Sequence, residues 1–240
     1  MAYRRRRYRR GRKKRRFNRV QYSRVGMRVG SGAKSKSKTV EYWSDAAIQS
    51  NLLNQTELTE IAAGTDRKTR ERDVMNFRGF ALKLHATNIV NRPVYFVVAV
   101  IGTRDGALVN GTDFFRDPGG DTRYLNFNNT GFTGVHRAYY PINTAKYALL
   151  WRKTYKMGNS SNAAGYTSGV APKNHLTIKK YFRINRQVQY SGSDALSCFN
   201  KIHLVWWCVK QDYTAVSPIT QEHTLNFHGS AVTYFRDIRR

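Results

Sequence analysis

The stretch HLTIKKYFRINRQVQY, residues 175–190, decides the fold class of this 240-residue chain. Large apolar and polar side chains occupy alternate sets of positions along it. The apolar set comprises Leu176, Ile178, Phe182, Ile184 and Val188. The polar set comprises Thr177, Lys179, Arg183, Asn185 and Gln187. Because successive side chains of a β-strand point to opposite faces, this pattern predicts a long strand with one face on a core and the other in water.

Strand patterns continue on both sides of this stretch. The other predicted strands lie within residues 75–90, 92–106, 145–157, 201–210 and 222–237. The segment KIHLVWWCVK, residues 201–210, is apolar on both faces of a strand, which predicts a strand that is central or covered twice.

Helical patterns are few. Residues 45–63 have a loose helical spacing diluted by Thr and Asn, and residues 112–117 fit one or two helical turns capped by Thr112. Strands alternating with helices would favour a parallel sheet, and those helices are missing. The sequence therefore predicts one all-β domain over residues 39–240, an antiparallel sandwich of the jelly-roll type.

Positive charge is concentrated at the start of the chain. Of the 42 Lys and Arg residues, 17 lie in residues 1–40, and the first carboxylate is that of Glu41. The rest of the chain holds 25 basic and 15 acidic residues. Like charges repel and cannot be buried together, so we expect residues 1–38 to form a disordered basic arm, whose second half (20–38) is a Gly-, Ser- and Lys-rich linker.

The first nineteen residues of this basic arm are the main candidate binding site. Arg dominates, which suits bidentate contacts to phosphate, and Tyr3, Tyr8 and Phe17 offer rings for base stacking. We expect sequence-independent, salt-sensitive binding of nucleic acid. A nuclear localisation signal needs only about five to eight basic residues, so import is a second role rather than the whole explanation. The alternatives are a localisation signal alone or a solubilising tail. The predicted binding residues are Arg4, Arg5, Arg6, Arg7, Arg9, Arg10, Arg12, Lys13, Lys14, Arg15, Arg16 and Arg19.

Two groups of basic residues in the domain are further candidates. Lys146, Arg152 and Lys156 share one face of a predicted strand, and Lys179 and Arg183 share the polar face of another. If both faces point at a common surface, they are able to contact a phosphate backbone. The alternative for each residue is an ordinary solvated face.

No catalytic motif is present, so we expect no enzyme activity and no cofactor. Cys198, His203 and Cys208 follow at intervals of five, which puts successive side chains on opposite strand faces and argues against a metal site. Both cysteines are expected to be small buried hydrophobes. Asp113, Asp117 and Asp121 are candidates for a cation site, with turn formation as the alternative.

The segment 105–145 combines Gly, Asn and Asp with many aromatic residues and is expected to form a large ordered loop system. Its aromatic residues are either interface material or a lid on the core. With two cysteines, no secretory signal and no apolar run beyond eight residues, we expect synthesis in a reducing compartment and no membrane partner. The aromatic residues of this segment are Phe114, Phe115, Tyr124, Phe127, Phe132, Tyr139 and Tyr140.

The order of these features resembles coat proteins of circular single-stranded DNA viruses, of the geminivirus- and circovirus-like group. KKYFRINRQVQY (179–190) followed by KIHLVWWCVK (201–210) is similar to their late strands, and FALKLHATNIVNRPVYFVVAVIGTRDG (80–106) to their early paired strands. VTYFRDI (232–238) is similar to their closing strand, and MAYRRRRYRRGRKKRR (1–16) to the circovirus-type start. The plant geminivirus proteins have an early Cys/His cluster proposed to bind zinc. This chain lacks it, so no zinc site is implied.

This resemblance implies an eight-stranded jelly roll that self-assembles, in about sixty copies, into an icosahedral shell around circular single-stranded DNA. It implies that the arm arginines bind the DNA and engage host nuclear import receptors, and that the protein is found in the virion and the host nucleus. Two alternatives remain: a coat protein of a satellite-type RNA virus, and a cellular ribosomal or chromatin-associated protein.

Overall fold

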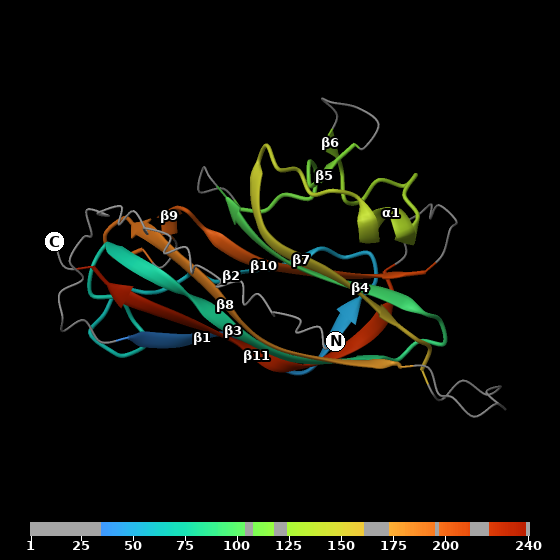
Figure 1. The fold of residues 1–240 in the computed structure, drawn as a ribbon, viewed down its shortest axis with the longest axis horizontal. Coiled ribbons are helices and arrows are strands. Elements are labelled where there is room, and N and C mark those ends of the chain that lie inside the picture. The colour runs from blue at the N-terminus through green and yellow to red at the C-terminus, as the bar shows by residue number, and fades with distance from the viewer. Residues whose placement is uncertain are drawn as a thin grey trace, which may run out of the picture.

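The computed structural model describes residues 35–103, 108–117, 124–160, 173–194, 197–211 and 221–238, which fold into a β-sandwich (Figure 1). Eight principal strands build its two layers. They are β1 (Lys36–Gln49), β2 (Asn54–Glu57), β3 (Val74–Asn88), β4 (Val94–Thr103), β7 (Tyr147–Met157), β8 (His175–Tyr190), β10 (Ile202–Lys210) and β11 (His223–Asp237). The smaller elements are β5 (Phe115–Arg116), β6 (Tyr124–Leu125), α1 (Gly134–Tyr139) and β9 (Ser197–Phe199).

The order of the strands is that of a jelly roll. Sheet A has the order β1-β11-β3-β8-β9, and sheet B has the order β2-β10-β4-β7. All of these pairs are antiparallel. Counting only the eight principal strands along the chain, sheet A holds the first, eighth, third and sixth, and sheet B the second, seventh, fourth and fifth. The predicted eight-stranded antiparallel jelly roll is confirmed, and β9 adds a short strand at the edge of sheet A.

The main core lies between the two sheets. Residues 178, 182 and 188 of β8 are buried, and the residues between them mostly face outward, as the alternating pattern predicts. Phe80 of β3 stacks on Phe182 of β8 with ring centroids 4.6 Å apart. Trp43 of β1 meets Trp206 of β10 edge-on at 5.5 Å, which ties sheet A to sheet B. Offset and edge-to-face rings of this kind add to the stability gained from area burial.

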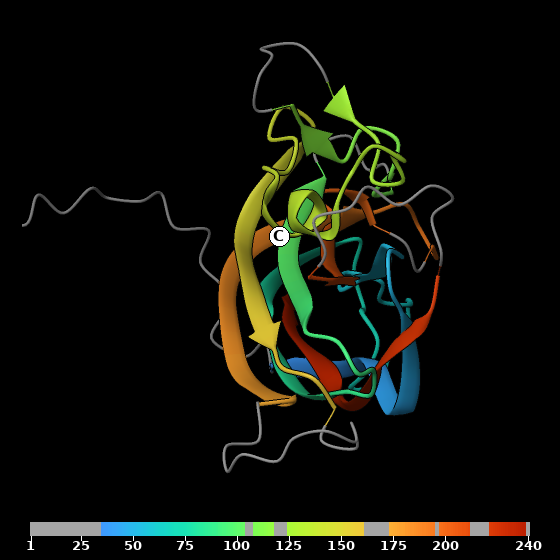
Figure 2. The same cartoon turned by 90° about the vertical axis from the view of Figure 1, so that its right-hand side faces the viewer.

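A second core lies on the outer face of sheet B. Every residue of β4 is buried, and so is nearly every residue of β10. Residues 108–117 and 124–146, which carry α1 and the β5–β6 pair, cover the side of sheet B that faces away from sheet A (Figures 1 and 2). We call these residues the lid. The expectation that residues 201–210 are covered twice is therefore confirmed.

The lid decides between the two expectations for the aromatic loop residues. Phe114, Phe115, Phe127 and Phe132 are buried against Trp207 and its neighbours, so these four form a lid rather than an interface. Tyr124 and Tyr139 remain exposed. Of the aromatic loop residues, the exposed Tyr124 and Tyr139 therefore remain the candidates for contacts with other molecules.

The two segments with weak helical patterns do not form helices. Residues 45–63 contain the end of β1 and all of β2, and residues 112–117 contain a turn and β5. The one helix among the described residues, α1, begins after Thr133, whose side chain accepts a hydrogen bond from the backbone N–H of His136 while the His136 ring accepts one from Thr133. This reciprocal cap makes six residues of helix possible where the hydrophobic spacing gave no signal.

Gly79 allows β3 and β8 to approach at an irregularity in their register. It has φ +150°, and a Cβ atom there would lie 1.9 Å from the backbone oxygen of Phe182. Any side chain would therefore push the two strands apart.

His203 of β10 is buried beneath the outer surface of sheet B, and neither ring nitrogen has a hydrogen-bond partner among the described residues. Burial lowers the pKa of His203 to about 4, since it penalises the charged ring. The nearby Glu57 opposes this change in pKa, and Lys201 adds to it.

We predict that the subunit loses stability between about pH 6.5 and pH 4. An unfolded chain protonates this histidine below about 6.5, whereas the folded chain keeps it neutral, so protonation favours unfolding by an amount of the order of 2–3 kcal/mol. The free energy of unfolding, measured with urea across this pH range, should fall less in His203→Leu than in the parent chain. The exposed His228→Leu is the control, and an equal decline in His203→Leu and the parent would contradict the prediction.

Candidate nucleic-acid interface

The basic arm joins the domain at the edge of sheet A. All twelve predicted arm residues lie outside the described residues. The first strand, β1, begins at Lys36, three residues before the predicted domain boundary at Thr39. Lys36 and Ser37 pair with Phe235 and Tyr234 near the end of β11. The described chain therefore starts beside the end of β11.

The outer face of sheet A, the side turned away from the core, carries two of the predicted basic residues. Lys179 and Arg183 are both exposed on β8, two positions to either side of Tyr181. The register places Lys179 directly opposite Lys83 of β3, and Arg183 opposite Gly79. Lys83 is not among the predicted binding residues, although its alternation with Leu82 and Leu84 in the sequence already indicates an outward position.

Tyrosines lie among these cations. Tyr181 is 50% exposed and Tyr42 is 68% exposed, which is unusual for side chains of this size. The rings of Tyr181 on β8 and Tyr234 on β11 are 5.8 Å apart at 66°. Tyr181 occupies one of the alternate positions that the polar residues of this strand share, so the sequence pattern already indicates that its side chain points outward. The contact between Tyr181 and Tyr234 cannot be read from the sequence, because the two residues are 53 positions apart.

Carboxylates are scarce on this face. Strands β3 and β8 contain no Asp or Glu. Glu41 of β1 accepts a hydrogen bond from Thr56 at 2.6 Å, and Asp237 of β11 is buried and ion-paired with Lys36 at 3.0 Å. Asp45, in a bulge of the edge strand β1, is exposed. Among the described residues, Lys83, Lys179 and Arg183 form no ion pair, so their charge is available to an anionic partner.

Arg152 is half-buried, and its guanidinium is engaged within the subunit, so its role as a nucleic-acid-facing residue stays a prediction. Its guanidinium donates hydrogen bonds to the backbone carbonyls of Ala138, at 2.7 Å, and Tyr140, and lies over the Trp207 ring. Burial lowers the pKa of Arg152 to about 10, which leaves it charged at neutral pH. It fastens α1 of the lid to sheet B.

Other arginines have similar internal positions. Arg137 of α1 is fully buried and donates to the carbonyls of Phe127, Asn129 and Phe132. Arg70 is also buried, and it donates to backbone carbonyls of two loops, including those of Ile61 and Asp194. Buried charges of this kind require full hydrogen bonding, and each supplies several planar donors. Part of the positive charge of the domain is therefore structural.

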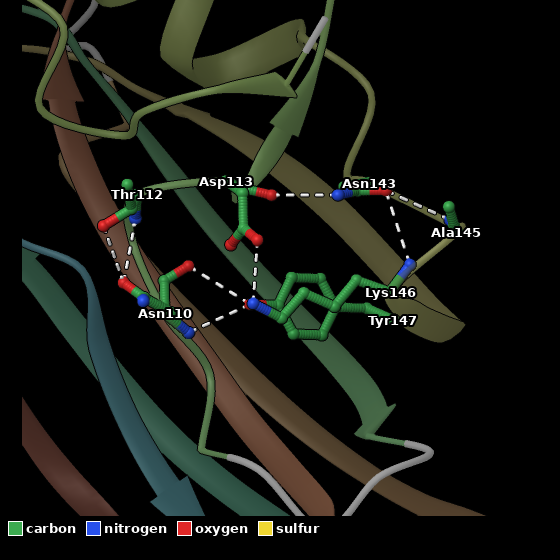
Figure 3. Close-up of polar contacts among 7 residues, drawn as sticks. All are labelled: Asn110, Thr112, Asp113, Asn143, Ala145, Lys146 and Tyr147. Carbon is green, nitrogen blue, oxygen red and sulfur yellow. Dashed lines mark hydrogen bonds and ion pairs between the residues drawn. The ribbon is translucent and has the colours of Figure 1, made fainter. Parts of the chain in front are cut away.

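Lys146 is paired within the lid. Its Nζ lies 2.7 Å from the Asp113 carboxylate, and Asn143 holds the same turn by accepting hydrogen bonds from the Ala145 and Lys146 backbone (Figure 3). Tyr147 completes the network through Asn110 (Figure 3).

Lys156 is exposed and lies near the Tyr95 ring, on the outer side of sheet B. The predicted groups on β7 and β8 therefore lie on opposite sides of the sandwich and do not form a common surface.

The predicted cation site is not assembled by the described residues. Asp113 is engaged by Lys146, and Asp121 lies outside the described ranges. The described part of the chain contains no group of three or more His, Cys, Asp or Glu residues arranged to hold a metal ion. Cys208 is buried and unpaired, as expected for a small hydrophobe, and burial raises its pKa to about 12. The Cys198 side chain is not described.

No family model matches the chain, and no curated protein matches it. In the ranges that the structure covers, no helix has both the length and the apolar character needed to cross a membrane.

The two groups of basic residues should respond differently to substitution. The double variant Lys179→Gln with Arg183→Gln should keep its stability but bind single-stranded oligonucleotides more weakly. The slope of log affinity against log salt should become shallower by about one to two. Arg152→Met should retain that slope and instead lose about 1–3 kcal/mol of stability, because carbonyls of the lid lose their donor. If Arg152→Met had a shallower salt slope and the double variant did not, the assignment of Lys179 and Arg183 to phosphate contacts and of Arg152 to the lid would be contradicted.

Proposed function

We propose that this chain is the coat protein of a small icosahedral virus with a circular single-stranded DNA genome. The observation that carries the proposal is the attachment of an acid-free, Arg-rich segment directly to the first strand of a jelly-roll sandwich. A jelly roll alone serves many functions, including capsid and lectin domains, so the arm is what favours packaging of nucleic acid.

The charge of the arm fits a packaging role when it is multiplied by assembly. A shell of about sixty copies, each with 17 basic residues in its first forty, presents on the order of a thousand positive charges. Contacts of this kind neutralise phosphate without reading sequence. The protein has a structural role in this proposal, with neither catalysis nor a cofactor.

Assembly requires surfaces that neighbouring copies are able to bury. Tyr139 on α1 and Tyr124 on β6 are 57% and 47% exposed, and both lie on the lid side of the sandwich. Leu108 and Leu149 are exposed at the same side. Aromatic side chains are enriched at protein interfaces, so these residues are the candidates for contacts between copies.

Replacing the arm arginines with glutamine should abolish packaging, whereas scrambling residues 4–16 should leave it nearly intact. The reason is that phosphate neutralisation depends on total charge rather than on residue order. Both full-length variants are compared with the parent by electron microscopy and nuclease protection. The parent and the scrambled chain should form shells on the order of 20 nm wide with protected DNA. A salt-stable monomer in all three cases would reject the coat-protein proposal, and protected RNA in place of DNA would favour the satellite-virus alternative.

The same arm is proposed to engage nuclear import receptors of the host, so that assembly takes place in the nucleus and the protein ends in the virion. Residues 1–19 fused to a cytoplasmic reporter should carry it into the nucleus, and the Arg-to-Gln arm should leave it outside. A parent fusion that stays in the cytoplasm would remove the import role without affecting the packaging role.

A further inference from the structure

The outer face of sheet A has the composition of a platform for single-stranded nucleic acid. Sheet B is covered on both sides, by sheet A and by the lid, but no described element covers the outer side of sheet A. We infer that nucleotide bases stack on Tyr42, Tyr181 and Tyr234 of this face while Lys83, Lys179 and Arg183 contact the phosphates. This inference rests on the proposed packaging function and identifies a second binding site within it, distinct from the arm.

The register shows how close these groups are. Tyr42 pairs with Ser230, Ser230 with Lys83, and Lys83 with Lys179, so one row across four strands runs from an exposed ring to two cations. Neighbouring strands are about 4.8 Å apart, so this row spans about 14 Å. Four residues further along β8, Arg183 belongs to the row of Gly79, Tyr234 and Ser37. Cations therefore flank Tyr181 on both sides along β8, and each of the other two tyrosines shares a row with at least one cation.

The centre of the face carries small and apolar residues. Ala81 lies between Tyr181 on one side and Val232 on the other, and Gly79 lies between Arg183 and Tyr234. Tyr181 is exposed and Tyr234 is half-buried, and no large side chain lies between their strands at these two positions of β3. Flat exposed rings with an apolar floor are what base stacking requires, and every base offers a π-face, so the site needs no sequence preference.

Charge favours nucleic acid over a second copy of the chain as the occupant. The same face of another subunit would bring Lys83, Lys179 and Arg183 against like charges, which is unfavourable at a packed interface. An anionic strand has complementary charge. The start of β1 also pairs with Tyr234 and its neighbour, so a strand held by the arm is already beside the platform.

The test measures base-dependent binding by the full-length chain. Affinities are determined for oligothymidylate and for an abasic deoxyribose-phosphate oligomer of the same length. The parent should prefer oligothymidylate, and Tyr181→Leu combined with Tyr234→Leu should lower that preference about fivefold or more for each stacked base lost. Tyr181→Phe with Tyr234→Phe should retain it, because phenylalanine keeps the ring. Tyr124→Leu with Tyr139→Leu, which changes two exposed tyrosines on the lid side, should also retain it.

Photo-crosslinking provides a readout that does not depend on whether a variant folds. Oligonucleotides containing 5-iodouracil, irradiated with the parent chain and analysed by mass spectrometry, should crosslink to Tyr42, Tyr181 or Tyr234. Crosslinks confined to residues 1–34 would overturn the inference. Equal affinity of the parent for the two oligomers would also overturn it. A leucine variant that no longer assembles but keeps its base preference would overturn it as well, because that result would assign the face to an interface between copies.

The two proposals fail separately. Shells that protect DNA but show no tyrosine-dependent base preference would leave the coat function standing without the platform. A tyrosine-dependent preference in a chain that never forms shells would leave the platform standing without the coat function.

Discussion

The whole architecture depends on keeping the continuous apolar strands β4 and β10 away from water. Both strands lie at the centre of sheet B and present large apolar side chains on both faces. One sandwich partner covers only one face, so a second layer is required. The lid supplies it with Phe114, Phe115 and Phe127 packed around Trp207, and the chain therefore has two cores on either side of one sheet.

This constraint makes the two sides of the molecule unequal. Sheet B is buried beneath the lid, and sheet A keeps its outer face open. Positive charge is divided accordingly. Arg137 of the lid and Arg152 of β7 donate hydrogen bonds to backbone carbonyls of the lid, whereas Lys83, Lys179 and Arg183 form no ion pair among the described residues of sheet A. A formal net charge therefore overstates the charge offered to a partner, and the distribution matters more than the sum.

The fold was largely predictable from sequence, and the candidate site only in part. Alternation in residues 175–190 is a local property that any half-buried strand must show, so the strand and its outward Lys179 and Arg183 followed from it. The same reasoning gave no indication of the contacts of Arg152. Strand periodicity left open which way its face points, and the carbonyls that its guanidinium meets, those of Ala138 and Tyr140, belong to the irregular segment before β7, whose path periodicity does not describe. Helix α1 escaped prediction because a six-residue helix depends on its cap rather than on periodicity.

The sequence by itself determined the strand-rich class, the single sandwich domain and the separation of a basic arm from that domain, since these depend on local periodicity and composition. Only the tertiary structure decided which outward faces stay open, because that depends on which distant segments pack over them. It fastened the guanidinium of Arg152 to carbonyls of the lid, and it brought the ring of Tyr234 of β11 to 5.8 Å from the ring of Tyr181, across β3. The alternation of residues along a strand specifies that a side chain points away from the core, but the path of the whole chain determines which residues, if any, that side chain contacts.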